Sequence, residues 1–150
     1  MKRLTIFLFI LLSFGSIVGQ TNENLTYKVT NYSINNQNFD ALALDGDVAL
    51  SFYMCDNNTL CFANQWRNSN SQSYGGVYAL QKKEIPETTT THAAIESKFT
   101  WNFFNTYDSN RGTAAVTFTQ ILVGNTIKFT AEIVVIETNE ILSFKGYLEN

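Results

Sequence analysis

Few side chains in this sequence have the types and spacings that catalysis requires. Histidine is the side chain that ordinarily titrates near neutral pH, and His92 is the only histidine of the 150 residues, which makes it the natural candidate for a general base. No Gly-x-Ser-x-Gly sequence or comparable motif supplies a nucleophile for it. An exposed histidine in a polar loop is the simpler interpretation. The sequence therefore predicts no catalytic residue, and we expect a protein that is not an enzyme.

Two acidic turns carry oxygen atoms at spacings that a calcium-binding loop could use. One is formed by Asp108, Asn110 and Gly112, and the other by residues 56–58. Neither completes the pattern, because Thr113 stands where a loop of the EF-hand kind needs glycine and no glutamate follows at the required distance. A hairpin turn that ends in a glycine bulge explains the first set better. We therefore predict no metal ion and no cofactor.

Aromatic side chains are the strongest candidates for a binding function. They make up 14% of the chain, and most of them fall on the inward positions of predicted strands. A barrel of about eight strands is just wide enough either to be filled by such side chains or to hold one small ligand, and a filled interior is the simpler interpretation. If a cavity is present, the predicted binding residues are Phe52, Trp66, Tyr78, Trp101, Phe103 and Arg111, with Tyr53, Arg67 and Tyr107 as further polar groups at the rim.

The first 19 residues are typical of a secretory signal peptide. Lys2 and Arg3 are followed by the apolar run 4–12 and by a region of small residues that ends at Gly19. The apolar run is too short to cross a hydrocarbon layer of ~30 Å, and no later segment is apolar enough to do so. We therefore predict that residues 1–19 are removed and that the protein is secreted, to the periplasm or the extracellular medium, without a stable membrane span.

The remaining residues 20–150 have the length of one domain. Without Lys2 and Arg3, eight of the ten Lys and Arg side chains remain against 13 Asp and Glu, so the formal charge changes from −3 to −5. The eight cations are scattered along the chain. Because binding to a phosphate backbone depends on clustered Lys and Arg, we expect no nucleic-acid partner.

The two cysteines, Cys55 and Cys61, could form a disulfide bond or contribute to a metal site. Structural zinc sites usually have four ligands, and the chain offers only one histidine to complete such a set. In an oxidising compartment an even number of cysteines is read first as a disulfide framework. The sequence therefore predicts a Cys55–Cys61 disulfide, and closing so short a loop should stabilise the fold by about 2 to 3 kcal/mol.

Period-two alternation of apolar and polar residues recurs along the chain and is typical of antiparallel strands. Turn-forming residues separate the alternating runs at the spacing that consecutive hairpins require. The pattern predicts strands over residues 25–34, 40–44, 47–54, 60–66, 74–81, 98–107, 113–122, 126–136 and 141–148.

Eight or nine short strands with inward aromatic residues cannot lie as one open sheet without exposing a large apolar face. They must either close on themselves or form two layers. The sequence therefore predicts an all-β, single antiparallel domain that is an up-and-down barrel or a β-sandwich, and the consecutive hairpins of the second half favour the barrel.

The segment 81–98 interrupts this pattern. It is polar and contains Pro86 and four consecutive threonines, which predicts a long connection between strands, with a short helix over residues 92–98. A connection of this length in a small domain is either functional or mobile.

Together these features predict an exported, non-catalytic β-domain that binds a small apolar molecule or a glycan in an aromatic-lined barrel or its mouth. The alternative is an extracellular or envelope protein–protein interaction module without a small-molecule ligand, which would act through an exposed edge strand or the segment 81–98.

Overall fold

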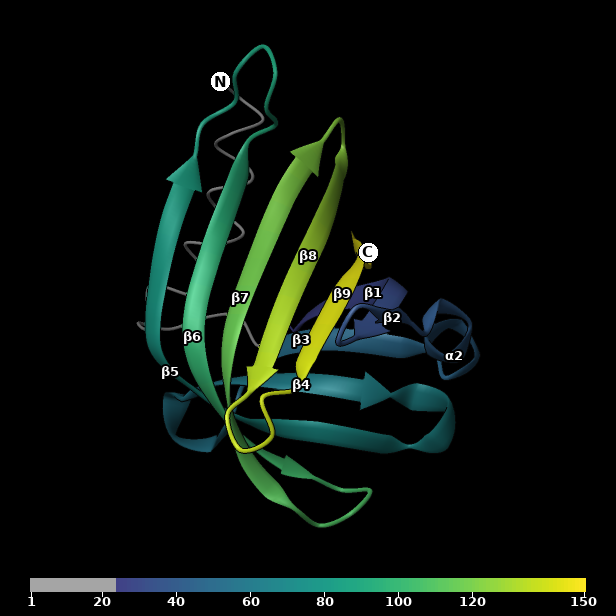
Figure 1. The fold of residues 1–150 in the computed structure, drawn as a ribbon. Helices are drawn as coiled ribbons and strands as arrows, with labels where there is room; N and C mark the ends of the chain where they lie inside the picture. Colours follow the sequence, from purple (N-terminus) through teal and green to yellow (C-terminus); the bar gives the residue numbers. More distant parts are fainter. Residues whose placement is uncertain (1–23) are drawn as a thin grey trace.

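Eight strands pair in chain order around a closed barrel in the computed structural model, which describes residues 24–150 (Figure 1). The predicted signal peptide, residues 1–19, lies outside the described residues. The barrel strands are β1 (Leu25–Ile34), β3 (Val48–Met54), β4 (Leu60–Trp66), β5 (Ser71–Ile85), β6 (Ala94–Asn105), β7 (Arg111–Val123), β8 (Thr126–Val135) and β9 (Ile141–Leu148). Strand β2 (Gln37–Asn38), the helix α2 (Asp40–Asp45) and the 3-10 turns η1 (Asp56–Asn58) and η2 (Arg67–Ser69) lie in the connections.

The barrel closes where β1 pairs with β9. This register runs from Tyr27 opposite Leu148 to Ile34 opposite Leu142. Every barrel strand is antiparallel to its neighbours, and the short β2 adds two residues beside β1. The all-β prediction is confirmed, and of the two architectures that the sequence allowed, the protein adopts the up-and-down barrel.

A glycine at the closing seam lets the two backbones approach. A Cβ atom placed on Gly146 of β9 would lie only 1.8 Å from the carbonyl oxygen of Lys28 on β1. No side chain can be accommodated at that distance, and the obstacle is backbone rather than a movable side chain. Residue 146 therefore has to be glycine for β9 to pair closely with β1.

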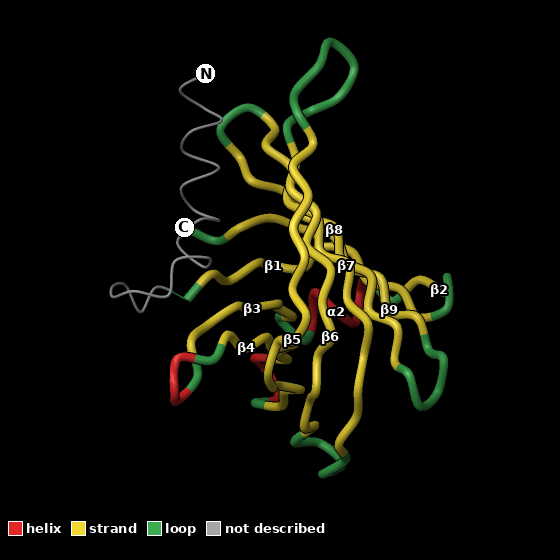
Figure 2. The backbone as a smooth tube through the Cα atoms, turned by 90° about the vertical axis from the view of Figure 1, so that its left-hand side faces the viewer, coloured by secondary structure: helices red, strands yellow, loops and turns green. Residues whose placement is uncertain are grey.

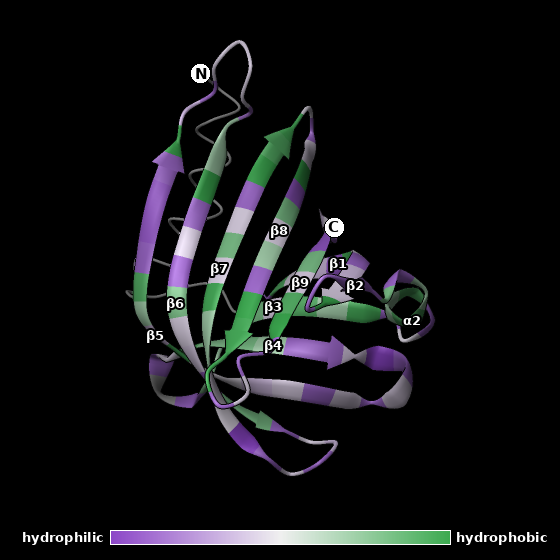
Figure 3. Ribbon diagram, in the orientation of Figure 1, coloured by the Kyte–Doolittle hydropathy of each residue, from purple (hydrophilic) through white to green (hydrophobic). Residues whose placement is uncertain are grey.

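Aromatic side chains fill the middle of the barrel. Tyr27, Phe118 and Phe129 are almost completely buried. The rings of Phe118 and Phe129 stack with centroids 5.2 Å apart, and Tyr27 meets Phe118 edge to face at 4.9 Å. Hydrophobic and hydrophilic residues alternate along β7 and β8, as Figure 3 shows, because successive side chains point to opposite faces of a strand. The middle of the barrel is therefore a packed core, and space for a ligand lies toward its ends.

The predicted disulfide is confirmed. Cys55 and Cys61 are bonded across the β3–β4 connection, with Cα atoms 5.8 Å apart. The amide of Cys55 also donates to the carbonyl of Thr59, 2.8 Å away. Because Tyr53 pairs with Cys61, the bond fixes the register of β3 against β4.

Within residues 24–150 there is no helix of the length and hydrophobicity needed to cross a membrane.

The strand predicted over residues 40–44 is wrong. These residues form α2, in which Ala43 is fully buried while Leu42 and Leu44 are more than half exposed. Alternating Ala and Leu fits either a strand or a helix, and Ala and Leu are both strong helix formers. The amide of Asp40 donates to Oδ1 of Asn38, which supports the start of this short helix.

The long connection predicted over residues 81–98 is also wrong in its extent. Strand β5 continues to Ile85 and β6 begins at Ala94, so the connection itself is 86–93. In place of the helix predicted over 92–98, residues 92–93 belong to this connection and residues 94–98 are strand. The β5–β6 hairpin projects at one end of the molecule (Figures 1 and 2). The sequence of β5 beyond residue 80 is polar because most of its side chains there are exposed to solvent.

Candidate ligand-binding site

One end of the barrel contains a cavity of about 340 Å³, which we call the mouth pocket. This end is formed by the β4–β5, β6–β7 and β8–β9 connections, opposite the projecting β5–β6 hairpin (Figure 1). The inner part of the pocket is lined mainly by Asn64, Trp101, Phe103, Ile133 and Leu142. Its rim carries Asp108, Arg111, Glu137 and Glu140.

Trp101 and Phe103 form the aromatic wall of the mouth pocket. They lie two residues apart on β6, so both side chains point into the barrel. Their ring centroids are 4.8 Å apart. Trp101 is buried, and its Nε1 donates a hydrogen bond of 2.9 Å to the carbonyl of Phe62, which fixes the orientation of the indole. Phe103 is only partly buried and borders the open space.

Two glycines flank Phe103 across the sheet. Gly75 of β5 and Gly112 of β7 are its direct partners in the two neighbouring strands. A Cβ atom on Gly112 would lie 2.4 Å from Cζ of Phe103, so the phenyl ring lies across this glycine. Gly112 also lines the mouth pocket, so the lack of a side chain at this position leaves open space beside the phenyl ring.

Asn64 supplies the one buried polar side chain of the pocket lining. It lies on β4 between Phe62 and Trp66 on the inward-facing side, and only 8% of its surface is exposed. Within residues 24–150, its Oδ1 atom is buried and accepts no hydrogen bond. Burying an acceptor in this way costs about 1 to 3 kcal/mol. The oxygen of Asn64 is therefore an unsatisfied acceptor behind the surface of the pocket, which a donor on a bound molecule reaches when a neighbouring side chain of the lining moves aside.

The rim of the mouth pocket is predominantly acidic. It carries three carboxyl groups against the single guanidinium of Arg111. Backbone amides hold two of the carboxylates, because the amide of Asn110 donates to Asp108 at 3.0 Å and that of Thr113 donates to Glu137 at 2.8 Å. The third carboxylate, Glu140, acts on Tyr32. Burial of the Tyr32 side chain, and secondly the negative charge of Glu140, raise the pKa of the Tyr32 hydroxyl to about 12. The field at this end disfavours anionic ligands.

The opposite end of the barrel offers much less space. A void of about 20 Å³ there is bordered by Phe52, Phe118 and Gln120. Its volume suits about one water molecule. Nε2 of Gln120 donates to the hydroxyl of Tyr27, and burial raises the pKa of that hydroxyl. Among residues 24–150, this void is too small for a ligand of ordinary size.

The structure brings together only some of the predicted binding residues. Trp101 and Phe103 line the mouth pocket, and Arg111 lies on its rim. Phe52 belongs to the central core, and Trp66 packs against Tyr32 with ring centroids 5.9 Å apart. Of the further residues predicted at the rim, Tyr53 is partly buried near the disulfide, Arg67 belongs to an ion-pair cluster, and Tyr107 is 87% exposed.

Tyr78 lies on the outer face of the barrel, where it is half exposed. A bulge in β5 directly after Tyr78 shifts the alternation of its side chains by one residue. Ala79 has a φ of 52°, and Ala79 and Leu80 together stand opposite the single residue Phe99. The extra residue lets both Val77 and Leu80 pack against the core, while Tyr78 points outward.

Sequence reasoning missed Asn64 and the acidic rim. The position of Asn64 carried a signal, because it shares its parity with Phe62 and Trp66 and is therefore a polar residue in an inward apolar row. Glu137 and Glu140 gave none, since they follow β8 in a turn and reach the pocket only through barrel closure.

The residues considered for other chemistry lie apart from the mouth pocket, except for the Asp108 turn. His92 is exposed in the connection 86–93. The Asp108 turn is a hairpin turn, but Ser109 takes the positive φ of 60°, and the glycine bulge expected at Gly112 is wrong because Gly112 pairs regularly with Phe103. Within residues 24–150, no three His, Cys, Asp or Glu side chains gather closely enough to hold a metal ion.

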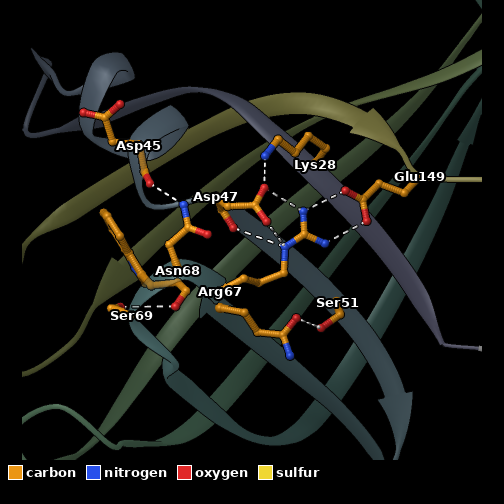
Figure 4. A network of polar contacts seen from close by, with 10 residues as sticks. Lys28, Asp45, Asp47, Ser51, Arg67, Asn68, Ser69 and Glu149 are labelled. Carbon is orange, nitrogen blue, oxygen red and sulfur yellow. Dashed lines mark hydrogen bonds and ion pairs between the residues drawn. The ribbon is translucent and has the colours of Figure 1, made fainter.

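A cluster of ion pairs lies on the outside of the barrel (Figure 4). Arg67 sits between two carboxylates: its Nε lies 2.8 Å from Oδ2 of Asp47, and its Nη2 lies 2.8 Å from Oε1 of Glu149. Lys28 also pairs with Asp47. These residues come from β1, the turn before β3, the turn after β4 and the segment after β9. The cluster thus ties the barrel seam to its neighbouring strands.

No family model, curated protein or solved structure matches this chain.

Proposed function

We propose that the protein is an exported, non-catalytic binding domain whose mouth pocket receives a small, mainly apolar molecule with a hydrogen-bond donor. The observation that carries this proposal is the buried, unpaired Oδ1 atom of Asn64 in a pocket walled by Trp101 and Phe103. A donor from the ligand would satisfy this oxygen while the aromatic wall covers the apolar part of the molecule.

The size and charge of the mouth pocket support this class of ligand. Its volume of about 340 Å³ lies at the lower end of the range of roughly 300 to 1,000 Å³ that is usual for small-molecule sites. Burial of the ligand against the apolar wall contributes about 25 cal/mol per Å² of apolar surface. The acidic rim favours a neutral or cationic molecule over a carboxylate.

Export is supported by the signal-like residues 1–19 and by the Cys55–Cys61 disulfide, since such bonds persist in oxidising compartments. The closed barrel favours ligand binding over the alternative of an interaction module that pairs through an edge strand. Among the described strands, the pairing of β1 with β9 leaves the two-residue β2 with a neighbour on one side only.

Three matched probes test the proposal by equilibrium dialysis: 1-aminonaphthalene has a donor, 1-methylnaphthalene has none, and 1-naphthoate is an anion. We expect the amine to bind about tenfold more tightly than the methyl compound, and the anion to bind most weakly. Asn64→Leu should abolish the preference for the amine and raise the melting temperature, because it removes the unpaired oxygen.

Asn125→Leu is the matched control, since Asn125 lies in the exposed β7–β8 turn away from the mouth pocket. It should leave all three affinities unchanged. Equal binding of the amine by the native protein and by Asn64→Leu would refute the role of Asn64. Failure of all three probes to bind would refute the mouth pocket as an apolar ligand site.

A further inference from the structure

A second concavity, of about 620 Å³, lies over the outer face of β5, β6 and β7. We call it the outer groove. Its side chains come from all three strands and from the turn after β8, and those that matter here are Tyr74, Tyr78, Asn102, Phe104, Arg111 and Glu137. The linings of the outer groove and the mouth pocket share Phe103, Arg111, Gly112 and Glu137, but Tyr74, Tyr78 and Phe104 stand on the opposite face of the sheet from Trp101.

One wall of the outer groove is a row of stacked side chains that crosses three strands. Tyr74 is the direct partner of Phe104, which is in turn the direct partner of Arg111. The rings of Tyr74 and Phe104 meet edge to face with centroids 6.1 Å apart. The guanidinium carbon of Arg111 lies 5.3 Å from the centroid of the Phe104 ring. These contacts hold the row in place, although Tyr74 and Arg111 are both exposed.

The floor of the outer groove is a polar row without large side chains. Gly76 is the partner of Asn102, and Asn102 is the partner of Thr113. Oγ1 of Thr113 donates to Oδ1 of Asn102 at 3.2 Å, which orients the amide. A surface of this kind can hydrogen-bond hydroxyl groups of a ligand that lies between the aromatic side chains.

Tyr78 forms the opposite wall of the outer groove, and its ring lies against Gly76 of the polar row. A Cβ atom on Gly76 would be 2.8 Å from the hydroxyl oxygen of Tyr78 and 3.0 Å from its Cζ. The phenol ring can therefore lie against the sheet only because residue 76 has no side chain. Half of Tyr78 remains exposed, so the ring presents a flat apolar surface to the groove.

We propose that the outer groove binds a neutral glycan. A pyranose ring has an apolar C–H face and an edge of hydroxyl groups, and the groove offers aromatic rings beside planar polar side chains. Tyr78 and the Tyr74–Phe104 pair stack on the sugar faces, while Asn102, Arg111 and Glu137 hydrogen-bond the hydroxyls. This site is additional to the mouth pocket and uses the other face of β6.

Charge and strand pairing argue against other occupants. The groove contains one guanidinium and one carboxylate, so it has no excess charge to attract an anionic lipid surface or a phosphorylated segment. Strand β6 is paired on both sides along its length, with β5 and with β7. An extended peptide therefore finds no free backbone there to pair with.

Affinity electrophoresis tests the proposal with four neutral polysaccharides: hydroxyethylcellulose, xylan, galactomannan and soluble starch. We expect the full mature protein to be retarded by at least one of them. Tyr78→Ala should weaken that affinity about tenfold, which corresponds to the loss of one aromatic stacking contact. Gly76→Ala removes no contacting side chain but displaces the Tyr78 ring, so it should weaken binding as well. Tyr78→Phe should retain most of it.

Two controls keep the glycan site distinct from the mouth pocket. Tyr107→Ala removes a more exposed aromatic side chain that does not line the groove, and it should leave retardation unchanged. Asn64→Leu should also leave it unchanged, and loss of retardation in this variant would overturn the assignment to the outer face. The proposal also fails if no polysaccharide retards the protein, if Tyr78→Ala is retarded like the native chain, or if neutral phosphatidylcholine vesicles bind the protein in a Tyr78-dependent way.

Discussion

Glu149 accepts two hydrogen bonds from the guanidinium of Arg67, at 2.8 and 2.9 Å, although 82 residues separate the two in the sequence. Arg67 follows β4, and Glu149 follows β9. The pair therefore connects the residues after β9 to the end of β4, which is the third strand from β9 across the closing seam in the sheet order. Because Arg67 also contacts Asp47, one side chain fastens three segments.

Arg67→Ala should destabilise the barrel by about 1 kcal/mol, because bidentate pairs in a network exceed the small contribution of a simple surface ion pair. Equilibrium unfolding in urea measures the change. Lys98→Ala is the control: its ion pair with Glu96 spans 3.6 Å and the Lys98 side chain is 60% exposed, so the free energy of unfolding should barely change. Equal effects of the two substitutions would contradict a special role of Arg67.

The same cluster predicts an acid-dependent loss of stability. Hydrogen bonds from Arg67 lower the pKa of Asp47 and of Glu149 from their ordinary values of 3.8 and 4.5, and Lys28 adds to the effect on Asp47. A carboxyl whose pKa is lowered by folding stabilises the folded state above its unfolded pKa, and this contribution is lost as the pH falls through the folded pKa.

The stability difference between the native protein and Arg67→Ala should therefore be constant from neutral pH down to about pH 5, and should shrink below about pH 4. Urea unfolding of both proteins across this range tests the sign. A difference that grows as the solution becomes more acidic would show that the carboxylates do not carry the interaction.

Gly146→Ala should be far more damaging than an ordinary glycine substitution in a strand. The new Cβ atom would meet the backbone oxygen of Lys28, which cannot move without separating β9 from β1. We expect a loss of about 3 kcal/mol, at the upper end of the usual effect of overpacking. Gly76→Ala is the matched control, because its obstacle is the mobile end of Tyr78, and it should cost less than about 1 kcal/mol. Similar unfolding midpoints for the two variants would rule out a steric role of the seam.

Strand positions were predictable where one face of the strand is buried and the other is exposed to solvent. The strands over 25–34, 60–66 and 141–148 coincide with β1, β4 and β9, because period-two patterning reports burial directly. The same rule fails at 40–44, where Ala and Leu alternate in a helix, and in the extension of β5 past residue 81, where the exposed side chains are nearly all polar.

The candidate sites were harder to predict because they depend on contacts across the barrel. The alternation identified Trp101 and Phe103 as inward residues of one strand, and both line the mouth pocket. It could not identify the glycines opposite Phe103, because cross-strand partners depend on register rather than on local sequence. The position of Tyr78 outside the barrel likewise depends on how β5 is paired with β6.

Phe103 and Phe104 are chain neighbours, yet one borders the cavity inside the barrel and the other stacks under Arg111 on its outer surface. Alternate side chains of β6 thus face two different candidate sites, and Phe103 lines both of them. Inserting or deleting a single residue in this strand would exchange its two faces and remove both sites at once. During divergence we expect β6 to keep its length while individual side chains change, and insertions to accumulate in the connection 86–93, where chain length carries little energetic consequence.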